Sequence, residues 1–332
     1  MNVLKGYRFR IYPNKEQQEF FTQTFGCVRF VYNHLLMARK EEHYSAESLK
    51  LTPASLKATY PFLKKTDSLA LANAQRNLDR AFLNFFKGRA GYPNLKSKKK
   101  TWQSYTTNNQ KHTIYFEEGK LKVPKLKTLI DVHQHREVKG QIKSATISAK
   151  NSEEYYVSLL CLEEITALPK TKKVVGVAYC PKHLVSVSCG REHLPELTKS
   201  TVEERLARAR QKLELRAKIV KKRKVHRDCA KNYQKQKRRV DKLYLTRAYQ
   251  KNDYIDKLTL KLIEQYDYVF LEKEPNFEKN CSFTETDWHV FMQKLRYKGK
   301  WYGKELRLID IASDQEEKSE TLEHLGRTQF SK

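Results

Sequence analysis

The chain has 332 residues, with 66 Lys and Arg against 38 Asp and Glu, so its formal net charge is +28 at pH 7. This length suffices for two or three domains, and so basic a protein is expected to bind a polyanion. Apolar runs stay short of the ~20 residues that cross a bilayer, and residues 1–13 lack the apolar core of a signal peptide, so we expect a cytoplasmic protein. The six Cys residues form no C-x-x-C pair, which favours small core residues over a zinc site or a disulfide framework.

The N-terminal quarter predicts one strand and two helices. Apolar and basic residues alternate over residues 3–12, the pattern of a half-buried strand. An Asn-x-x-Gln capping box at Asn14 opens a helix that runs to about residue 40. A second helix is expected between Asp67 and Gly88, because apolar residues recur there at helical spacing. Residues 14–88 therefore predict a small helical domain.

The composition changes after Gly91. A basic, turn-rich joint is followed by residues 101–168, which alternate like short strands. This pattern predicts a β-barrel-like module, and it permits the strand at 3–12 to complete that barrel. The helical domain would then be an insertion between two pieces of one barrel.

Residues 172–180 and 184–190 predict a buried strand and its hairpin partner. A long helical stretch follows, from about 201 to 265, opened by a capping box of Thr201 and Glu204. Further on, we expect a buried strand that ends at Glu272, a helix over 287–303 and a last strand over 304–313. The tail from residue 310 is acidic, and we expect it to be poorly ordered.

The helical stretch is strongly basic. Residues 205–251 hold 19 Lys and Arg against three acidic residues. Leu206, Leu213 and Val220 fall seven residues apart, so one face is expected to pack while the rest stays basic. A solvated coiled-coil face is the simple reading, but the scarcity of acids favours a phosphate-binding surface.

Seven segments, in this order, resemble the TnpB proteins of bacterial insertion sequences, which are RNA-guided DNA nucleases. The segments are "YRFRIYPNKEQ", "FGCVRFVYNHLL", "LDRAFLNFFKG", "YPNLKSKKK", "QSYTTNN", "KLKVPKL" and "KWYGKEL". The resemblance spans roughly residues 3–315. It implies a multi-domain α+β fold, with a wedge β-barrel, an inserted helical recognition domain and a RuvC-like (RNase H-type) α/β domain that carries the basic helical hairpin. The expected bounds are 1–13 with 96–170 for the wedge, 14–95 for recognition, and 171–332 for the RuvC-like domain with its helical insertion at about 201–265.

The resemblance also implies a two-metal nuclease that needs three carboxylates. Where the family has G-[IV]-D-x-G, this chain has "GVAYC", so Ala178 stands at the position of the first Asp. Glu272 matches the second acid, but the zinc knuckle and the last Asp of the family are missing before Lys332. We therefore expect a degenerate, inactive RuvC-like domain without catalytic residues, without zinc and without catalytic Mg²⁺, and hence a protein that is not an enzyme.

This pattern is similar to a subgroup, the TnpB-like nuclease-dead repressors (TldR). The similarity implies a monomer on a guide RNA, with a scaffold and a short 3′ guide, in a bacterial cytoplasm at the nucleoid. The guide would direct binding to double-stranded DNA beside a short adjacent motif, and the R-loop would repress a promoter by occupancy. The alternatives are a decayed TnpB remnant that binds RNA only, a residual nuclease, a structural RNA-binding protein, and a conventional helix-turn-helix repressor built from residues 14–88.

The resemblance places the adjacent-motif contacts at the start of the second recognition helix and in a Thr-Asn-Asn turn, at Leu69, Ala72, Asn73, Thr107 and Asn108. A helix cap and an Asn-rich turn are equally good readings of each residue alone. The expected contacts with RNA or DNA backbone are basic, aromatic or amide residues: Arg29, Tyr32, Asn33, Arg76, Arg80, Lys96, Lys98, Lys99, Lys100, Arg205, Arg208, Lys221, Lys222, Arg223, Lys224, Arg238 and Arg239. Tyr32 fits a core position equally well.

Overall fold

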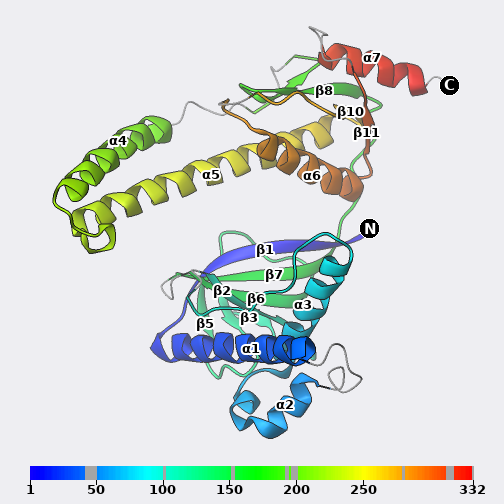
Figure 1. Ribbon diagram of the computed structural model, residues 1–332. Coiled ribbons are helices and arrows are strands. Elements are labelled where there is room, and N and C mark those ends of the chain that lie inside the picture. Colours follow the sequence, from blue (N-terminus) through cyan, green and yellow to red (C-terminus); the bar gives the residue numbers. More distant parts are fainter. Residues whose placement is uncertain are drawn as a thin grey trace. The chain divides into compact units, whose positions relative to one another are not determined.

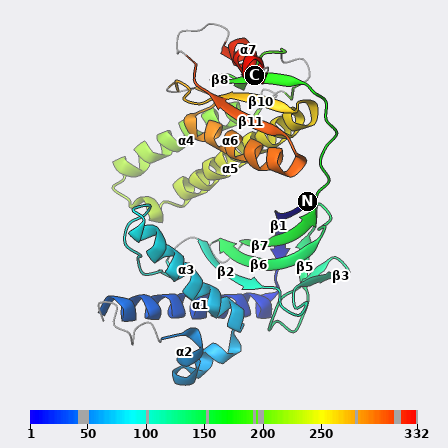
Figure 2. The ribbon, with the colours of Figure 1, turned by 90° about the vertical axis from the view of Figure 1, so that its right-hand side faces the viewer.

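The computed structural model describes residues 1–41, 51–99, 102–150, 154–190, 194–195, 201–278, 281–311 and 318–330. The chain divides into two compact units, one of residues 2–164 and one of Met1 with residues 165–332. Each unit has its own hydrophobic core, and Figures 1 and 2 show the elements of both. Within the described ranges, no helix is both long and apolar enough to span a membrane.

The unit of residues 2–164 is built on an antiparallel sheet of seven strands in the order β2-β6-β7-β1-β5-β4-β3. The strands are β1 (Asn2–Tyr12), β2 (Trp102–Asn108), β3 (Tyr115–Glu117), β4 (Lys120–Lys122), β5 (Ile130–His133), β6 (Gln141–Lys150) and β7 (Glu154–Glu164). β1 pairs with β7 along its length, from Asn2 opposite Glu164 to Ile11 opposite Tyr155. This pairing confirms that the N-terminal strand completes the sheet.

The sheet curls but stays open. β2 and β3 form its two edges, so the described strands make a half-barrel, an open version of the β-barrel-like module that we expected. The β3 edge is formed by short strands, because β3 and β4 have three residues each.

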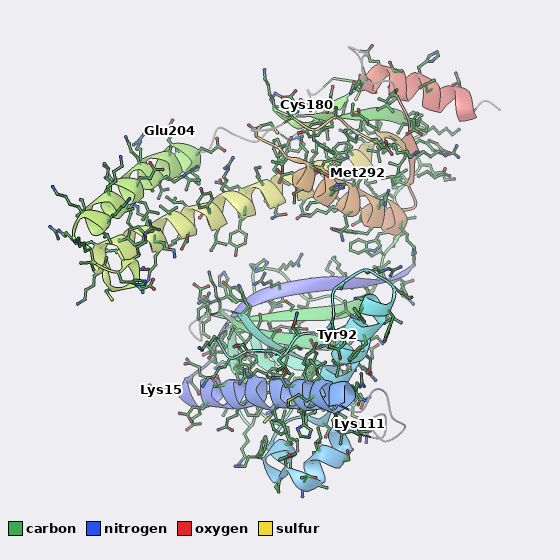
Figure 3. All side chains as sticks on the ribbon, viewed as in Figure 1. Lys15, Tyr92, Lys111, Cys180, Glu204 and Met292 are labelled. Carbon is green, nitrogen blue, oxygen red and sulfur yellow. The ribbon has the colours of Figure 1, made fainter. Side chains whose placement is uncertain are left out.

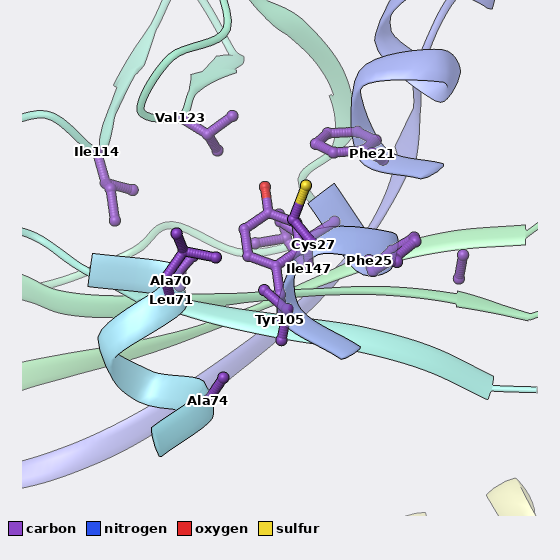
Figure 4. Close-up of a cluster of buried hydrophobic side chains, with 14 of the residues drawn as sticks. Phe21, Phe25, Cys27, Ala70, Leu71, Ala74, Tyr105, Ile114, Val123 and Ile147 are labelled. Atoms are coloured by element: carbon purple, nitrogen blue, oxygen red, sulfur yellow. The ribbon is translucent and has the colours of Figure 1, made fainter. Parts of the chain in front are cut away.

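Helices cover one face of this sheet. They are α1 (Lys15–Glu41) and α3 (Ser68–Phe86), while α2 (Pro53–Thr59) and a short 3₁₀ helix, η2 (Pro61–Lys65), lie between them in the chain, and α2 packs on α3. The predicted capping box is confirmed, because Asn14 Oδ1 accepts the N–H of Gln17 at 2.9 Å. Figure 4 shows Phe21 and Phe25 of α1 and Leu71 of α3 meeting Tyr105 of β2 in the core. The sequence patterns did not predict α2 or η2.

The second unit has a four-stranded sheet in the order β11-β10-β8-β9. Its strands are β8 (Val174–Cys180), β9 (Leu184–Val187), β10 (Tyr268–Glu272) and β11 (Glu305–Ile309). β8 and β9 form the predicted hairpin, and β10 lies parallel to both β8 and β11. The helices are α4 (Thr201–Lys222), α5 (Lys231–Gln265), α6 (Glu285–Tyr302) and α7 (Lys318–Phe330), with a 3₁₀ turn, η3 (Arg227–Cys229), between α4 and α5.

The acidic tail is ordered where the structure describes it, so our expectation of disorder is wrong. Helix α7 packs on the sheet, with Leu322 fully buried against Phe270 of β10. The approach is close, because a Cβ on Gly176 would lie 1.9 Å from the carbonyl oxygen of Ser319. A Cβ on Gly326 would likewise lie 2.2 Å from the ring of Phe270. Two glycines therefore make room for the docking of α7.

Candidate nucleic-acid interface

Helices α4 and α5 lie side by side as a long antiparallel hairpin (Figure 1). Their seam buries Val202, Leu206 and Ala209 of α4 against Val240 and Leu243 of α5, with Leu213 partly buried beside them. This confirms the predicted packed face for Leu206 and Leu213, whereas Val220, the third residue of the heptad spacing, is not part of this cluster. The remaining faces of the hairpin are mostly charged, with exposed apolar or aromatic side chains among the charges, for example Leu215, Ile219 and Tyr249.

The predicted backbone-binding residues of this hairpin all lie on its exposed faces: Arg205, Arg208, Lys221, Lys222, Arg223, Lys224, Arg238 and Arg239. Figure 3 shows the side chains that project from both helices, with Glu204 labelled near the start of α4. Arg208 pairs with Glu204 at 3.1 Å, and Arg247 pairs with Glu203 at 3.1 Å. With 19 basic and three acidic residues over 205–251, acids of this segment cannot neutralise its charge. The hairpin is therefore a cationic surface that can bind phosphates.

A second group of predicted residues lies where the N-terminus of α3 meets the end of β2. Asn73 donates its side-chain N–H to the carbonyl of Thr106 at 2.9 Å and to Asn108 Oδ1 at 3.3 Å. The Thr107 hydroxyl donates to Asp67, the residue that caps α3. Burial, with the Asp67 carboxylate nearby, raises the pKa of Tyr105. The structure thus brings Asn73, Thr107 and Asn108 together.

Two details differ from the expectation for this group. The "TTNN" segment is not a turn, because Thr107 and Asn108 are the last residues of β2 and pair with β6. The side chain of Thr107 is fully buried, so in this conformation it supports the site and does not face a ligand. Leu69, Ala72, Asn73 and Asn108 are partly exposed.

The third group joins α1 to the basic joint after α3. Tyr32 is 5% exposed, which places it in the core, and the Lys96 ammonium lies 3.9 Å from its ring centroid. Asn33 exchanges two hydrogen bonds with the backbone of Lys96, at 3.0 and 2.8 Å. Arg29 donates to Gln103 Oε1 at 2.9 Å. These contacts hold the joint against α1. Of the other predicted residues, Arg76, Arg80, Lys98 and Lys99 are exposed, and Lys100 lies outside the described residues.

The fourth group is the sheet edge where the resemblance implies a metal site. β8 and β10 are neighbours, with Leu271 opposite Val177, so Glu272 lies beside Ala178. Glu272 is 3% exposed and accepts the N–H of Tyr179 at 3.1 Å and the ammonium of Lys318 at 3.0 Å. Ala178 is buried at the same edge, which lines a cavity of about 540 Å³.

A pair of divalent ions needs several carboxylates at one place. Among the described residues, no group of three or more His, Cys, Asp or Glu could hold a metal ion. The described part of this edge therefore does not fit a two-metal centre. The acids Asp314, Glu316 and Glu317 lie in residues 312–317, outside the described ranges.

The six free cysteines differ in burial, and Cys180 and Cys281 are half-buried. Cys27 and Cys161 are buried, as expected for small core residues. Cys189 and Cys229 are exposed, so the expectation is wrong for them. Cys189 lies in the turn after β9, and Cys229 is the last residue of η3.

Two family models match the chain. One, described as "Helix-turn-helix domain" of the IS605 OrfB proteins, matches residues 1–48, and the other, described as "Probable transposase" of the same group, matches residues 156–273. Residues 1–41 fold as strand β1 and the single long helix α1, which is not a helix-turn-helix. The structure thus gives no support to a conventional helix-turn-helix repressor at this end of the chain.

Curated relatives match most of the chain. A Streptomyces pristinaespiralis protein named an RNA-guided DNA endonuclease is 29% identical over 324 residues, which cover 93% of this chain and 78% of that protein. The Escherichia coli protein InsQ, also named an RNA-guided DNA endonuclease, is 24% identical, and the alignment covers 94% of this chain and 82% of InsQ. A solved structure of a Cas12f1-sgRNA-target DNA complex shares the fold, with a TM-score of 0.54, 13% identity and coverage of 90% of this chain and 74% of that one.

These findings overturn the expectation that the chain is not an enzyme. That expectation depended on one strand position, Ala178, and on where the chain ends, and neither establishes inactivity. The two relatives that match most of the chain are named endonucleases, and two models of one family together match 1–48 and 156–273. The chain belongs to the TnpB family of IS605 OrfB transposon proteins, and its relatives include proteins named as RNA-guided DNA endonucleases.

Proposed function

We propose that this protein binds a guide RNA and, by base pairing through that RNA, a complementary DNA target beside a short adjacent motif. The observation that carries the proposal is the basic α4–α5 hairpin, supported by relatives named RNA-guided DNA endonucleases. The structural neighbour was solved with an sgRNA and target DNA. We further propose that the R-loop represses transcription when it forms over a promoter, because a bound complex excludes RNA polymerase.

The dimensions of the hairpin suit a duplex. Helix α4 has 22 residues and is therefore about 33 Å long, close to the length of one helical turn of duplex. Exchange of a DNA duplex for an RNA–DNA hybrid is nearly balanced in energy, so contacts with phosphates decide whether it proceeds. Lys and Arg on the hairpin would supply such contacts without reading sequence, and the guide would supply specificity.

We assign residues 171–332 to a RuvC-like domain. A β8–β9 hairpin whose first strand lies parallel to β10, with β11 beyond, is consistent with an RNase H-type sheet. The wedge at 1–13 and 96–170, and the recognition domain at 14–95, remain assignments from the family resemblance. The adjacent motif would be read at the N-terminus of α3 and the end of β2, by Leu69, Ala72, Asn73 and Asn108.

The test uses the purified protein with an RNA that carries a chosen guide. Labelled duplex with a matching target, offered beside a randomised adjacent motif, is expected to shift in a gel, and duplex with a scrambled target is not. A promoter reporter measures repression, and the same duplex incubated with Mg²⁺ measures cleavage as a separate readout. RNA binding with no guide-dependent shift would contradict the proposal and favour a protein that binds RNA only.

A further inference from the structure

The seven-stranded sheet has a second face, opposite the helices, that carries aromatic and arginine side chains. On β1, Tyr7, Phe9 and Ile11 point into the core, so the alternation of a strand sends Arg8, Arg10 and Tyr12 to the other side. On β7, Tyr155 and Val157 are buried, and Tyr156 lies between them on the outer face. Trp102 of β2 is 46% exposed and Tyr12 is 56% exposed.

These side chains form a continuous row, which we call the aromatic ladder: Trp102, Arg8, Tyr156, Arg10 and Tyr12. The Arg8 guanidinium lies 5.7 Å from the ring centroid of Trp102 and 4.5 Å from that of Tyr156. The Arg10 guanidinium lies 5.0 Å from Tyr156 and 5.9 Å from Tyr12. The rings of Trp102 and Tyr156 are themselves 5.9 Å apart. Rings and guanidinium groups therefore alternate across three strands.

The middle of the ladder is held in place. Arg10 donates to the Tyr156 hydroxyl at 3.0 Å, and that hydroxyl donates to Glu154 at 3.1 Å. Glu154 also pairs with Arg10 at 3.2 Å. Arg8 is exposed and stands between the two rings. Side chains that are already fixed lose little conformational entropy when a ligand stacks on them.

This chemistry matches unpaired nucleotides. Aromatic rings and guanidinium planes stack on bases of any sequence, and the cations attract the phosphates between them. The neighbouring strands add hydroxyl groups on the same face, since Ser148 and Ser104 alternate with buried Ile147 and Tyr105. Hydroxyl groups next to a stacking surface can bond the 2′-hydroxyl that distinguishes RNA from DNA.

We propose that the aromatic ladder binds two or three unpaired nucleotides of the RNA partner by stacking. The inference rests on the proposed function for its biological ligand and adds a defined contact surface outside the basic hairpin. It assigns Trp102 and Tyr156 to base stacking, and Arg8 to both stacking and phosphate attraction.

Tryptophan fluorescence tests the proposal directly, because a stacked base quenches the indole. Of the three tryptophans, Trp288 is buried, at 2% exposure, and Trp301 is partly exposed. Trp102 is therefore the most accessible fluorescent reporter, and Trp301 contributes a background signal. The full chain is titrated with single-stranded octaadenylate, as RNA and as DNA, without a guide. We expect the RNA to quench the fluorescence of the parent saturably, and we expect Trp102→Phe to remove this quenching. The affinity of that variant for RNA should be retained, because phenylalanine still stacks.

Truncation is expected to weaken binding. Trp102→Ala and Tyr156→Ala should each bind the RNA octamer about 5- to 150-fold more weakly, the range of one base–aromatic stack. The matched control is Phe62→Ala, which removes an aromatic ring of equal exposure, 46%, from outside the ladder and should bind as the parent does. Thermal melting of each variant separates loss of binding from loss of folding.

The outcomes separate the ladder from the proposed function. Unchanged octamer affinity in a folded Trp102→Ala variant, or quenching that survives Trp102→Phe, would overturn the ladder, as would equal binding of the DNA octamer. The complete guide RNA and its DNA target are measured in parallel. Guided DNA binding that is insensitive to Trp102→Ala would refute the ladder alone, whereas ladder-dependent binding of the octamer without guided DNA binding would refute the proposed function alone.

Discussion

Neutralising the tip of the basic hairpin gives a quantitative prediction. Lys221, Lys222, Arg223 and Lys224 follow one another at the end of α4 and are all exposed. If each contacts one phosphate, replacing all four with Ala lowers the slope of log Kd against log salt by about 3 for single strands and about 3.6 for a duplex. If the parent and the variant bind equally at 1 M salt, this difference in slope makes the variant bind about 10³-fold more weakly at 0.1 M salt.

The assay is a salt titration of RNA binding, by fluorescence anisotropy, for the parent and the quadruple variant. The matched control replaces Lys111, Lys125, Lys127 and Lys143, four exposed lysines of the other unit, and so removes the same net charge. We expect the control to change the slope by less than about 1. Equal slopes for both variants would refute the assignment of the hairpin as the phosphate-binding surface, because net charge alone would then explain the effect.

Three further predictions concern the fold, and denaturant unfolding measures each. Gly176→Ala should lower the free energy of unfolding by about 1–3 kcal/mol, because the added methyl group meets α7. The control Gly6→Ala should not destabilise the protein, because nothing lies within 4 Å of its Cβ. Equal effects of the two variants would contradict the docking of α7. Asp67→Ala should cost about 1–2 kcal/mol through loss of the cap of α3, and an unchanged stability would count against that cap. Asp267→Asn should cost about 3–5 kcal/mol at pH 7, because the buried Lys304 ammonium loses its anionic partner and keeps only neutral acceptors such as the Pro169 carbonyl.

The pH dependence of the last variant has a definite sign. Burial by itself raises the pKa of Asp267, but the hydrogen bonds from Lys304 and from the backbone outweigh it and hold the pKa below the ordinary value of 3.8. A carboxylate with a lowered folded-state pKa stabilises the protein above its unfolded pKa and loses that contribution as the pH falls through the folded one. The difference between parent and Asp267→Asn should therefore be constant near neutral pH and shrink below about pH 4. A difference that grows on acidification would contradict this account.

Local signals in the sequence predicted those elements whose pattern is set by their own residues. Asn14 caps α1 as its side chain suggested, and α3 begins directly after Asp67, where the apolar spacing placed it. The heptad spacing of Leu206 and Leu213 likewise located the packed seam of the hairpin. Such features depend on neighbours within one or two helical turns, so they can be recognised without the rest of the fold.

Features set by distant partners were not predictable in the same way. The Asn-rich segment around Asn108 favours a turn, yet the pairing of β2 with β6 holds Asn108 in a strand. The acidic composition of the tail concealed α7, since its docking depends on Gly176 and Gly326, each of which fits a partner far away in the chain. The aromatic ladder was missed for the same reason, because Trp102 and Tyr156 meet only when β2, β6 and β7 pair. The alternation around Arg8 and Arg10 was the one local signal for it.

RNA-guided binding is tested most directly by the RNA that the protein carries. The protein would be expressed with its native flanking DNA and purified, and the RNA that accompanies it would be sequenced. The account predicts one discrete RNA with a structured scaffold and a short 3′ guide that matches a DNA site, enriched over the quadruple hairpin variant at Lys221, Lys222, Arg223 and Lys224. Heterogeneous RNA with no fixed ends, carried equally by the parent and the variant, would contradict it.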